Sequence, residues 1–190
     1  QCAHPGGAAI CGAMLWYPDE TIQHAGIVTG LGGYAGHSHK YKKKGGSGYL
    51  FRTSTVQDFS GVTGACLLVK TAVYDEMHGL DEQFAVAFND VDFCLRVRDA
   101  GYRIAWTPYA ELIHYESKSR GGDEKDPVKA ARFAAEQQRL YTIHGKENIL
   151  DDPYYNPNLT RDREDFSESD DLRRLKEGRV TVRFRGGTLQ

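Results

Sequence analysis

Two acids and an amide stand at the start of an expected helix, in the stretch FNDVDFCLRVRDAGYRI. Asn89, Asp90 and Asp92 follow the apolar segment 84–88 and precede apolar residues at helical spacing, with Gly101 as the expected helix end. In one interpretation Asn89 is the N-cap, and both acids favour the positive end of the helix. In the other, two carboxylates at a strand end raise one another's pKa and supply a general base. The pattern alone leaves both interpretations open.

A second group of candidate residues lies in the glycine-rich segment 30–48. His37 and His39 would share one face of a strand and could hold a metal ion, but in such a loop they more often bind nothing. The run GLGGYA at 30–35 matches the dinucleotide pattern GxGxxA, yet no helix is expected after it, so a mobile loop is the better interpretation. The lysines at 42–44 are expected to be solvated, or to meet an anionic acceptor.

The bulk composition is that of an ordinary globular domain. The chain has 190 residues, 40% hydrophobic and 26% charged, with a formal net charge of -2. This balance argues against binding to nucleic acid, which needs a basic excess. No apolar run approaches the roughly 20 residues of a membrane span. The four cysteines show no paired metal spacing and are expected to be reduced thiols in a cytosolic setting.

The expected elements alternate between strands and helices, which favours an α/β layered fold. Strands are expected over 8–17, 21–30 and 61–70, then a short strand over 102–108 that Pro108 ends, and an edge strand over 179–184. Helices are expected over 71–79 and 89–100. A third begins at the N-cap Asp126 and ends at Gly145. We expect residues 1–160 to form the domain, and residues 161–190 a charged tail or the start of a following segment.

A long ordered series of motifs carries a resemblance to a known family. The series is LWYPDETIQHAGIVTGLGG, VTGACLLVK, GLDEQFAVAFNDVDFCLRVRDAGYRIAWTPYAELIHYESKSRG and DPYYNPNLT, and it covers about residues 8–160. It resembles the C-terminal half of a family 2 glycosyltransferase, the inverting GT-A type that includes bacterial rhamnosyl- and galactofuranosyltransferases. The resemblance implies a partial GT-A (nucleotide-diphospho-sugar transferase-like) fold: the acceptor half, with a mixed sheet and flanking helices.

The same resemblance implies roles for individual residues. Asp90 corresponds to the catalytic base, and Asn89 stands where many members have an acid. His114, in LIHYES, corresponds to a histidine that joins the metal in some members, although a lone histidine after a strand is otherwise most often structural. The remaining implied substrate-binding positions are Thr63, Gly64, Asn89, Asp92 and Arg120, the last near the sugar-nucleotide phosphates.

The implied activity is transfer of a sugar, of hexosyl or rhamnosyl type, from a UDP- or dTDP-sugar to a saccharide acceptor, with inversion and with Mg²⁺ or Mn²⁺. The family's DxD donor motif is missing, so residues 1–190 are expected to be inactive alone and to self-associate through an exposed sheet edge. The expected location is cytoplasmic, peripheral at the inner face of the membrane. The alternatives are a non-catalytic polysaccharide- or protein-binding module and, more remotely, a hydrolase whose metal is held by His37, His39 and Asp90.

Overall fold

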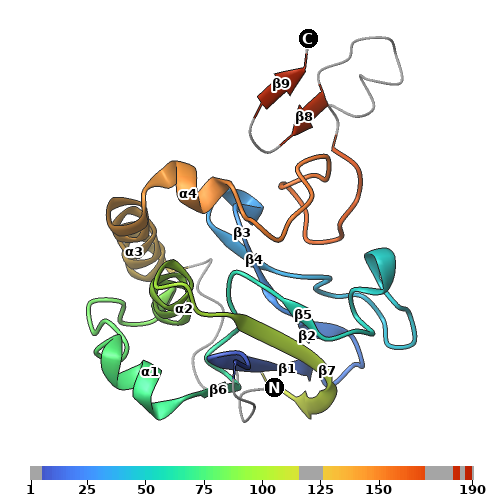
Figure 1. The fold of residues 1–190 in the computed structure, drawn as a ribbon, viewed down its shortest axis with the longest axis horizontal. Coiled ribbons are helices and arrows are strands. Elements are labelled where there is room, and N and C mark those ends of the chain that lie inside the picture. The colour runs from blue at the N-terminus through green and yellow to red at the C-terminus, as the bar shows by residue number, and fades with distance from the viewer. Residues whose placement is uncertain (1–5, 116–125, 170–181, 185–186, 190) are drawn as a thin grey trace.

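The computed structural model describes residues 6–115, 126–169, 182–184 and 187–189. Its centre is a five-stranded mixed sheet in the order β2, β1, β7, β5, with β6 beside β2 on the same edge of β1 (Figure 1). β1 and β7 are parallel, and the other pairings in this sheet are antiparallel. Its strands are β1 (Ile10–Trp16), β2 (Ile22–His24), β5 (Gln57–Asp58), β6 (Leu67–Val69) and β7 (Ile104–Ile113).

The helices lie mainly on one side of this sheet. One apolar cluster joins the sheet to α2, and a second joins α2 to α3, so α2 lies between the sheet and α3 (Figure 1). Two hairpins lie outside the sheet. The helices and 3₁₀ turns are η1 (Leu31–Gly33), η2 (Tyr49–Phe51), α1 (Thr71–Glu76), α2 (Asn89–Asp99), α3 (Pro127–His144) and α4 (Lys146–Leu150). The hairpins pair β3 (Ile27–Thr29) with β4 (Ala35–His37), and β8 (Val182–Phe184) with β9 (Gly187–Leu189). The prediction of an α/β fold is confirmed.

Local sequence explains the two best-predicted elements. β1 is almost wholly apolar because its side chains are buried on both faces of the sheet. It also needs Gly12, where a Cβ atom would lie 2.5 Å from the Val62 side chain. α3 begins as predicted, since the Asp126 carboxylate accepts a hydrogen bond from the Val128 N–H at 2.9 Å. It ends at Gly145, whose φ of 78° is in the region that favours glycine.

The strand expected over 21–30 is wrong as a single, partly exposed element. It is divided into β2 and β3, and both are buried. The break falls at Gly26, which has a φ of 98°, and a Cβ atom there would lie 2.6 Å from the Phe59 ring. Only glycine fits this position, so the chain turns and β3 pairs with β4 outside the main sheet.

The expected buried strand over 61–70 is interrupted by a turn at residues 64–66. Gly61 forms an isolated bridge with Ile27, and β6 pairs with residues 10–12 of β1, with Leu68 at its centre 63% exposed. The preceding residues form a turn in which the Cys66 N–H donates to the Thr63 carbonyl at 3.3 Å. The apolar Leu68 points to solvent from this edge strand, and an exposed apolar residue cannot be told from a buried one by residue type alone, which explains why the buried assignment failed.

Pro108 does not end its strand as predicted, because β7 continues to Ile113. The partner of β1 jumps from Thr107 to Glu111 between Ala13 and Met14, so Pro108 lies in a β-bulge. A bulge leaves residues outside the hydrogen-bond ladder, and a proline there forfeits no donor.

The segment expected to be a mobile loop is ordered around His39. This side chain is buried and stacks on Phe166 with ring centroids 4.2 Å apart. Its Nε2 accepts the Tyr49 N–H at 3.0 Å, and its Nδ1 lies 2.7 Å from the Ser38 hydroxyl. After GLGGYA the chain forms β4, so the absence of a following helix, which spoke against a dinucleotide site, is confirmed.

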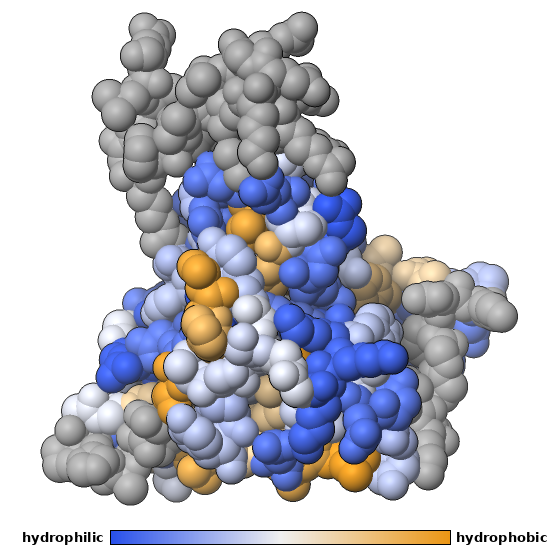
Figure 2. Space-filling view, turned by 90° about the vertical axis from the view of Figure 1, so that its right-hand side faces the viewer, coloured by the Kyte–Doolittle hydropathy of each residue, from blue (hydrophilic) through white to orange (hydrophobic). Residues whose placement is uncertain are grey.

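The face of the molecule shown in Figure 2 is largely hydrophilic. The turn near residue 50, which projects at the right of Figure 1, lies on the face shown in Figure 2, where apolar residues gather in small areas. Lys43 and Lys44 are exposed, as expected of solvated lysines, and the Lys44 ammonium also pairs with Glu111 at 2.9 Å. Within the described ranges, no helix has the length and apolar character that crossing a membrane requires.

The burial of His39 predicts how stability depends on pH. Burial, helped by Lys42, lowers the pKa of His39 to about 4. As the pH falls below 6.5, the histidine is protonated in the unfolded chain but stays neutral in the folded chain. The contribution of His39 to the free energy of unfolding is therefore complete above pH 6.5 and is lost as the pH drops toward 4. One such histidine accounts for about 3 kcal/mol over this range. We expect His39→Gln to show a shallower loss of unfolding free energy between pH 6.5 and 4.5 in urea titrations. Parallel curves for the two proteins would contradict this.

Candidate active site

Asp90 lies at the amino end of α2, where its carboxylate meets the turn at Gly64. Oδ2 accepts the Gly64 N–H at 2.7 Å, and Oδ1 accepts the Val91 N–H at 2.9 Å. Gly64 is exposed, and Asp90 is half-buried. A carboxylate oriented by two backbone donors beside an open turn can accept a proton from a hydroxyl group that approaches from solvent.

The start of α2 differs from the predicted capping pattern. Phe88, not Asn89, precedes the first helical residue, and it makes no side-chain cap. The Asn89 side chain instead accepts the Asp90 N–H at 2.7 Å. Phe88 is buried with a φ of 64°, a left-handed conformation that costs of order 1–3 kcal/mol in a bulky residue. This strained turn sets the direction in which the chain delivers Asp90.

A buried histidine that sequence reasoning missed supports the other side of the turn. The Nε2 atom of His24 lies 3.3 Å from the Gly26 N–H and 3.4 Å from the Thr63 N–H, so it accepts from both and the ring proton is on Nδ1. Nδ1 then donates to Nδ1 of His37, 3.1 Å away. Burial, with the nearby His37 and His114, lowers the pKa of His24 well below its usual range, which keeps the ring neutral. The only signal for this role in the sequence was a histidine inside an apolar strand.

His114 completes the group of side chains at this end of the sheet. It directly follows β7, and its backbone N–H donates to the carbonyl of Trp16, the last residue of β1, at 2.8 Å. Nδ1 of His114 is buried and has no hydrogen-bond partner among the described residues. Such a nitrogen fits a metal ligand. Asp90, Gly64, Thr63, His24, His37 and His114 thus gather where the two parallel strands end, the usual place for a ligand site in α/β sheets.

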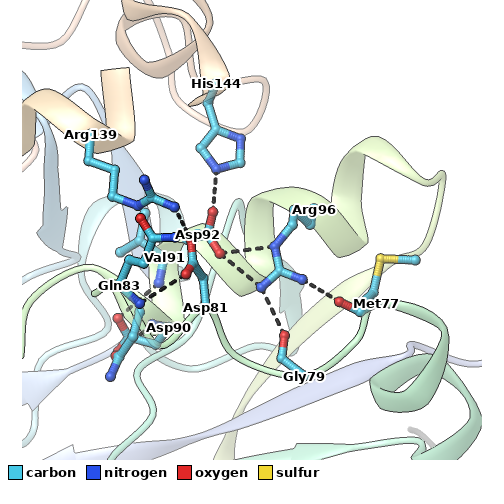
Figure 3. A network of polar contacts seen from close by, with 11 residues as sticks. Met77, Gly79, Asp81, Gln83, Asp90, Val91, Asp92, Arg96, Arg139 and His144 are labelled. Carbon is cyan, nitrogen blue, oxygen red and sulfur yellow. Dashed lines mark hydrogen bonds and ion pairs between the residues drawn. The ribbon is translucent and has the colours of Figure 1, made fainter. Parts of the chain in front are cut away.

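Asp92 does not join this group. Residues two apart on a helix do not face each other, so the two acids point in different directions and the expected carboxylate pair does not form. Asp92 is 1% exposed, and Oδ2 lies 2.9 Å from Nε and 2.8 Å from Nη2 of Arg96. Oδ1 lies 2.8 Å from Nε2 of His144, the last residue of α3. Both oxygens therefore serve the interior (Figure 3), which leaves none for a substrate.

The Asp92 network ties three segments together. Arg96 also donates to the Met77 carbonyl at 2.6 Å and to the Gly79 carbonyl at 2.9 Å, just after α1 (Figure 3). α3 makes two further contacts with the segment that leads to Asp90. Arg139 pairs with Asp81 at 2.6 Å, and the buried Glu136 accepts the Ala87 N–H at 2.7 Å.

The other predicted site residues are not assembled. His39 serves the fold, so His37, His39 and Asp90 form no hydrolase site. Among the described ranges, no three His, Cys, Asp or Glu side chains converge to hold a metal ion, so His114 could supply only one ligand of such a site. Arg120 lies outside the described residues.

Comparisons with known proteins give relatives but no family model, and no solved structure matches. A Sinorhizobium fredii protein named "Uncharacterized protein y4gI" is 48% identical over 84% of this chain and 18% of its own length. The O-antigen biosynthesis protein RfbC of Myxococcus xanthus is 34% identical over 84% of this chain and 12% of its own. A Mycobacterium tuberculosis N-acetylglucosaminyl-diphospho-decaprenol L-rhamnosyltransferase is 32% identical over 42% of this chain and 24% of its own.

These similarities support a relationship to glycosyltransferases, through relatives named for O-antigen biosynthesis and rhamnosyl transfer. The chain spans less than a quarter of the length of each of these relatives. The match to RfbC extends over 161 residues, whereas the match to the rhamnosyltransferase extends over 80.

The Asp92 network predicts a large loss of stability when its acid is neutralised. Asp92→Asn leaves Arg96 and the buried His144 without their carboxylate, and breaking a buried ion pair in this way costs about 3 kcal/mol. The measurement is the urea midpoint, with an unchanged slope. Asp99→Asn, on the exposed end of the same helix, is the matched control and should cost less than about 1 kcal/mol. Equal losses in the two variants would show that the network does not hold the helices together.

Proposed function

We propose that this chain is the acceptor half of an inverting glycosyltransferase of the GT-A type, and that Asp90 is its catalytic base. The observation that carries the proposal is the position of Asp90, which accepts the Gly64 N–H at 2.7 Å on an open turn at the ends of β1 and β7. The relatives named for rhamnosyl transfer and O-antigen biosynthesis favour sugar transfer over other reactions of a carboxylate base.

In the proposed reaction, Asp90 removes the proton from a hydroxyl group of a saccharide acceptor. The hydroxyl oxygen then attacks the anomeric carbon of a UDP- or dTDP-sugar from the face opposite the nucleoside diphosphate, and the configuration inverts. The Gly64 N–H orients the carboxylate, and the turn at Thr63 is itself held by His24. Much of the rate would come from this positioning.

The proposed metal, Mg²⁺ or Mn²⁺, would be held in part by His114, whose buried Nδ1 has no other partner among the described residues. When bound, such an ion offsets the charge that develops on the leaving diphosphate. The chain's own contribution is to fix His114 against the end of β1 through its backbone N–H.

The far part of β7 is the sheet edge that we propose for self-association. β7 pairs with β1 on both sides of its bulge, whereas among the described residues β5 pairs with its other edge at Ala105 and Trp106 alone. Farther along β7, Tyr109 is 78% exposed and Ile113 is 59% exposed. Self-association through this edge stays a prediction. So does the location of the protein in the cytoplasm, at the inner face of a membrane.

The first test of this function is Asp90→Asn in the full-length protein. Loss of a general base lowers turnover by about 10²–10⁴-fold. Asn can still accept the Gly64 N–H, so the fold and donor binding should be kept. Asp99→Asn, at the other end of α2, is the matched control and should turn over normally. Near-normal turnover of Asp90→Asn would show that Asp90 only stabilises the start of α2. It would favour the alternative function, a non-catalytic saccharide- or protein-binding module.

The second test is His114→Ala, which should raise the Mn²⁺ concentration needed for half-maximal activity without unfolding the protein. The reason is the loss of one nitrogen ligand. His78→Asn, at an exposed histidine, serves as the control. An unchanged Mn²⁺ titration together with a lower melting temperature would make His114 a structural residue.

A further inference from the structure

A shallow cavity that is largely open to solvent, with a volume of about 460 Å³, lies beside β5 and the residue that precedes β7. Arg98, near the carboxyl end of α2, acts through its charge on Tyr154 of the cavity lining and donates to the Ser60 hydroxyl at 3.0 Å, whereas Asp90 stands at the amino end of that helix. The eleven residues of α2 separate the two places by roughly 15 Å at 1.5 Å per residue. The volume is within the range that holds a small ligand. The lining residues are Arg52, Val56, Gln57, Asp58, Arg103 and Tyr154.

The half-buried Arg52 forms part of the wall of this cavity, and the negative charge of Asp152 acts on it from nearby. Its guanidinium lies 4.8 Å from the centre of the Phe59 ring and 5.5 Å from that of Phe166. Its Nε and Nη2 atoms are buried without a hydrogen-bond partner among the described residues. Burial lowers the pKa of Arg52, as expected for a charge removed from water. A buried guanidinium is costly unless an anion pairs with it.

The other charges near the cavity do not supply that anion. Asp58 is occupied by Arg103, which holds it with Nε at 2.9 Å and Nη2 at 3.0 Å. Asp152 is close enough to oppose the shift of Arg52, but its oxygens accept the Thr29 and Tyr154 N–H groups, each at 2.7 Å. The Arg103–Asp58 pair is neutral as a unit, so the lining as a whole carries one positive charge.

The walls of the cavity are fixed before any ligand arrives. Asp58 is in β5, opposite Ala105 of β7. The Arg103 carbonyl accepts the Ala9 N–H at 2.8 Å, at the start of the sheet. Tyr154 is held through Asp152, which is itself bound to β3. A binding site on such rigid supports loses little free energy to reorganisation.

We propose that this cavity binds an oxyanion, a phosphate or a carboxylate, carried on a molecule of about the size of a sugar. Nε and Nη2 of Arg52 are buried, so the remaining nitrogen, Nη1, is the atom that would donate a charge-assisted hydrogen bond to an oxygen of either group. The volume exceeds the needs of a bare ion. The Tyr154 hydroxyl and the Gln57 side chain can bond to neutral hydroxyl groups of the same ligand.

Calorimetric titration of the full chain with glucose 1-phosphate, glucuronate and glucose tests the proposal and separates the two sources of negative charge. We expect at least one of the two anions to bind, and glucose to bind at least tenfold more weakly, because it lacks the charge-assisted hydrogen bond. Binding of neither anion, or equal binding of all three sugars, would overturn the proposal.

Charge variants at the cavity should shift the affinity in opposite directions. Asp58→Asn removes the only acid of the lining and should tighten anion binding, whereas Arg103→Gln exposes that acid and should weaken binding by about tenfold. Both side chains are partly exposed, so neither change should unfold the protein. Arg52→Gln should abolish binding, and circular dichroism will show whether that buried variant folds.

Two controls fix the location of the bound anion. Asp90→Asn should leave anion binding unchanged, because Asp90 is at the opposite end of α2, and so should Lys43→Gln, which removes an exposed positive charge away from the cavity. Loss of binding in Asp90→Asn would place the anion at the candidate active site and overturn the proposal. Affinities that Asp58→Asn and Arg103→Gln leave unaltered would do the same. The proposed transferase activity can fail without affecting any of these results.

Discussion

The buried carboxylate of Asp92 is the contact on which the arrangement of the helices depends. A charge that is 1% exposed requires partners, and it finds them on two other segments: His144 at the end of α3, and Arg96, which holds the carbonyls that follow α1. Because one acid serves both, α1, α2 and α3 keep a fixed relation over the same face of the sheet. Glu136 and Arg139 of α3 also bond to the segment 81–87, which therefore keeps the same fixed position against α3.

The Asp92 network matters for the candidate site because Asp90 is only two residues from Asp92. The network fixes one face of the first turn of α2, and the strained Phe88 fixes the direction of the chain before it. Asp90, on another face of that turn, is left to meet Gly64. The turn that contains Gly64 is held at its other end by the neutral His24, which accepts a hydrogen bond from the Thr63 N–H. A base that reaches solvent is thus supported on both sides by buried polar contacts.

The two ends of α2 differ in their chemistry. The amino end carries the candidate base and the histidines, and it is the end for which relatives named for glycosyl transfer suggest a reaction. Near the carboxyl end, the charge of Arg98 acts on Tyr154, which lines the cavity that also includes Arg52. One rigid helix therefore separates a place for proton removal from a place for a bound anion, and changes at one end can be tested without disturbing the other.

The sequence by itself determined the elements whose signals are local: α3 with its Asp126 cap and Gly145 end, the apolar strand β1, and the acids at the start of α2. It could not show that Pro108 lies in a bulge, that Gly26 turns the chain under Phe59, or that Asp92 faces inward while Asp90 faces the Gly64 turn. Nor could it bring His24, in a short strand, to a turn 39 residues later. Capping and periodicity act over one or two turns of chain, whereas the partners of a buried charge or a neutral histidine are set by packing between distant segments, and only the tertiary structure decides them.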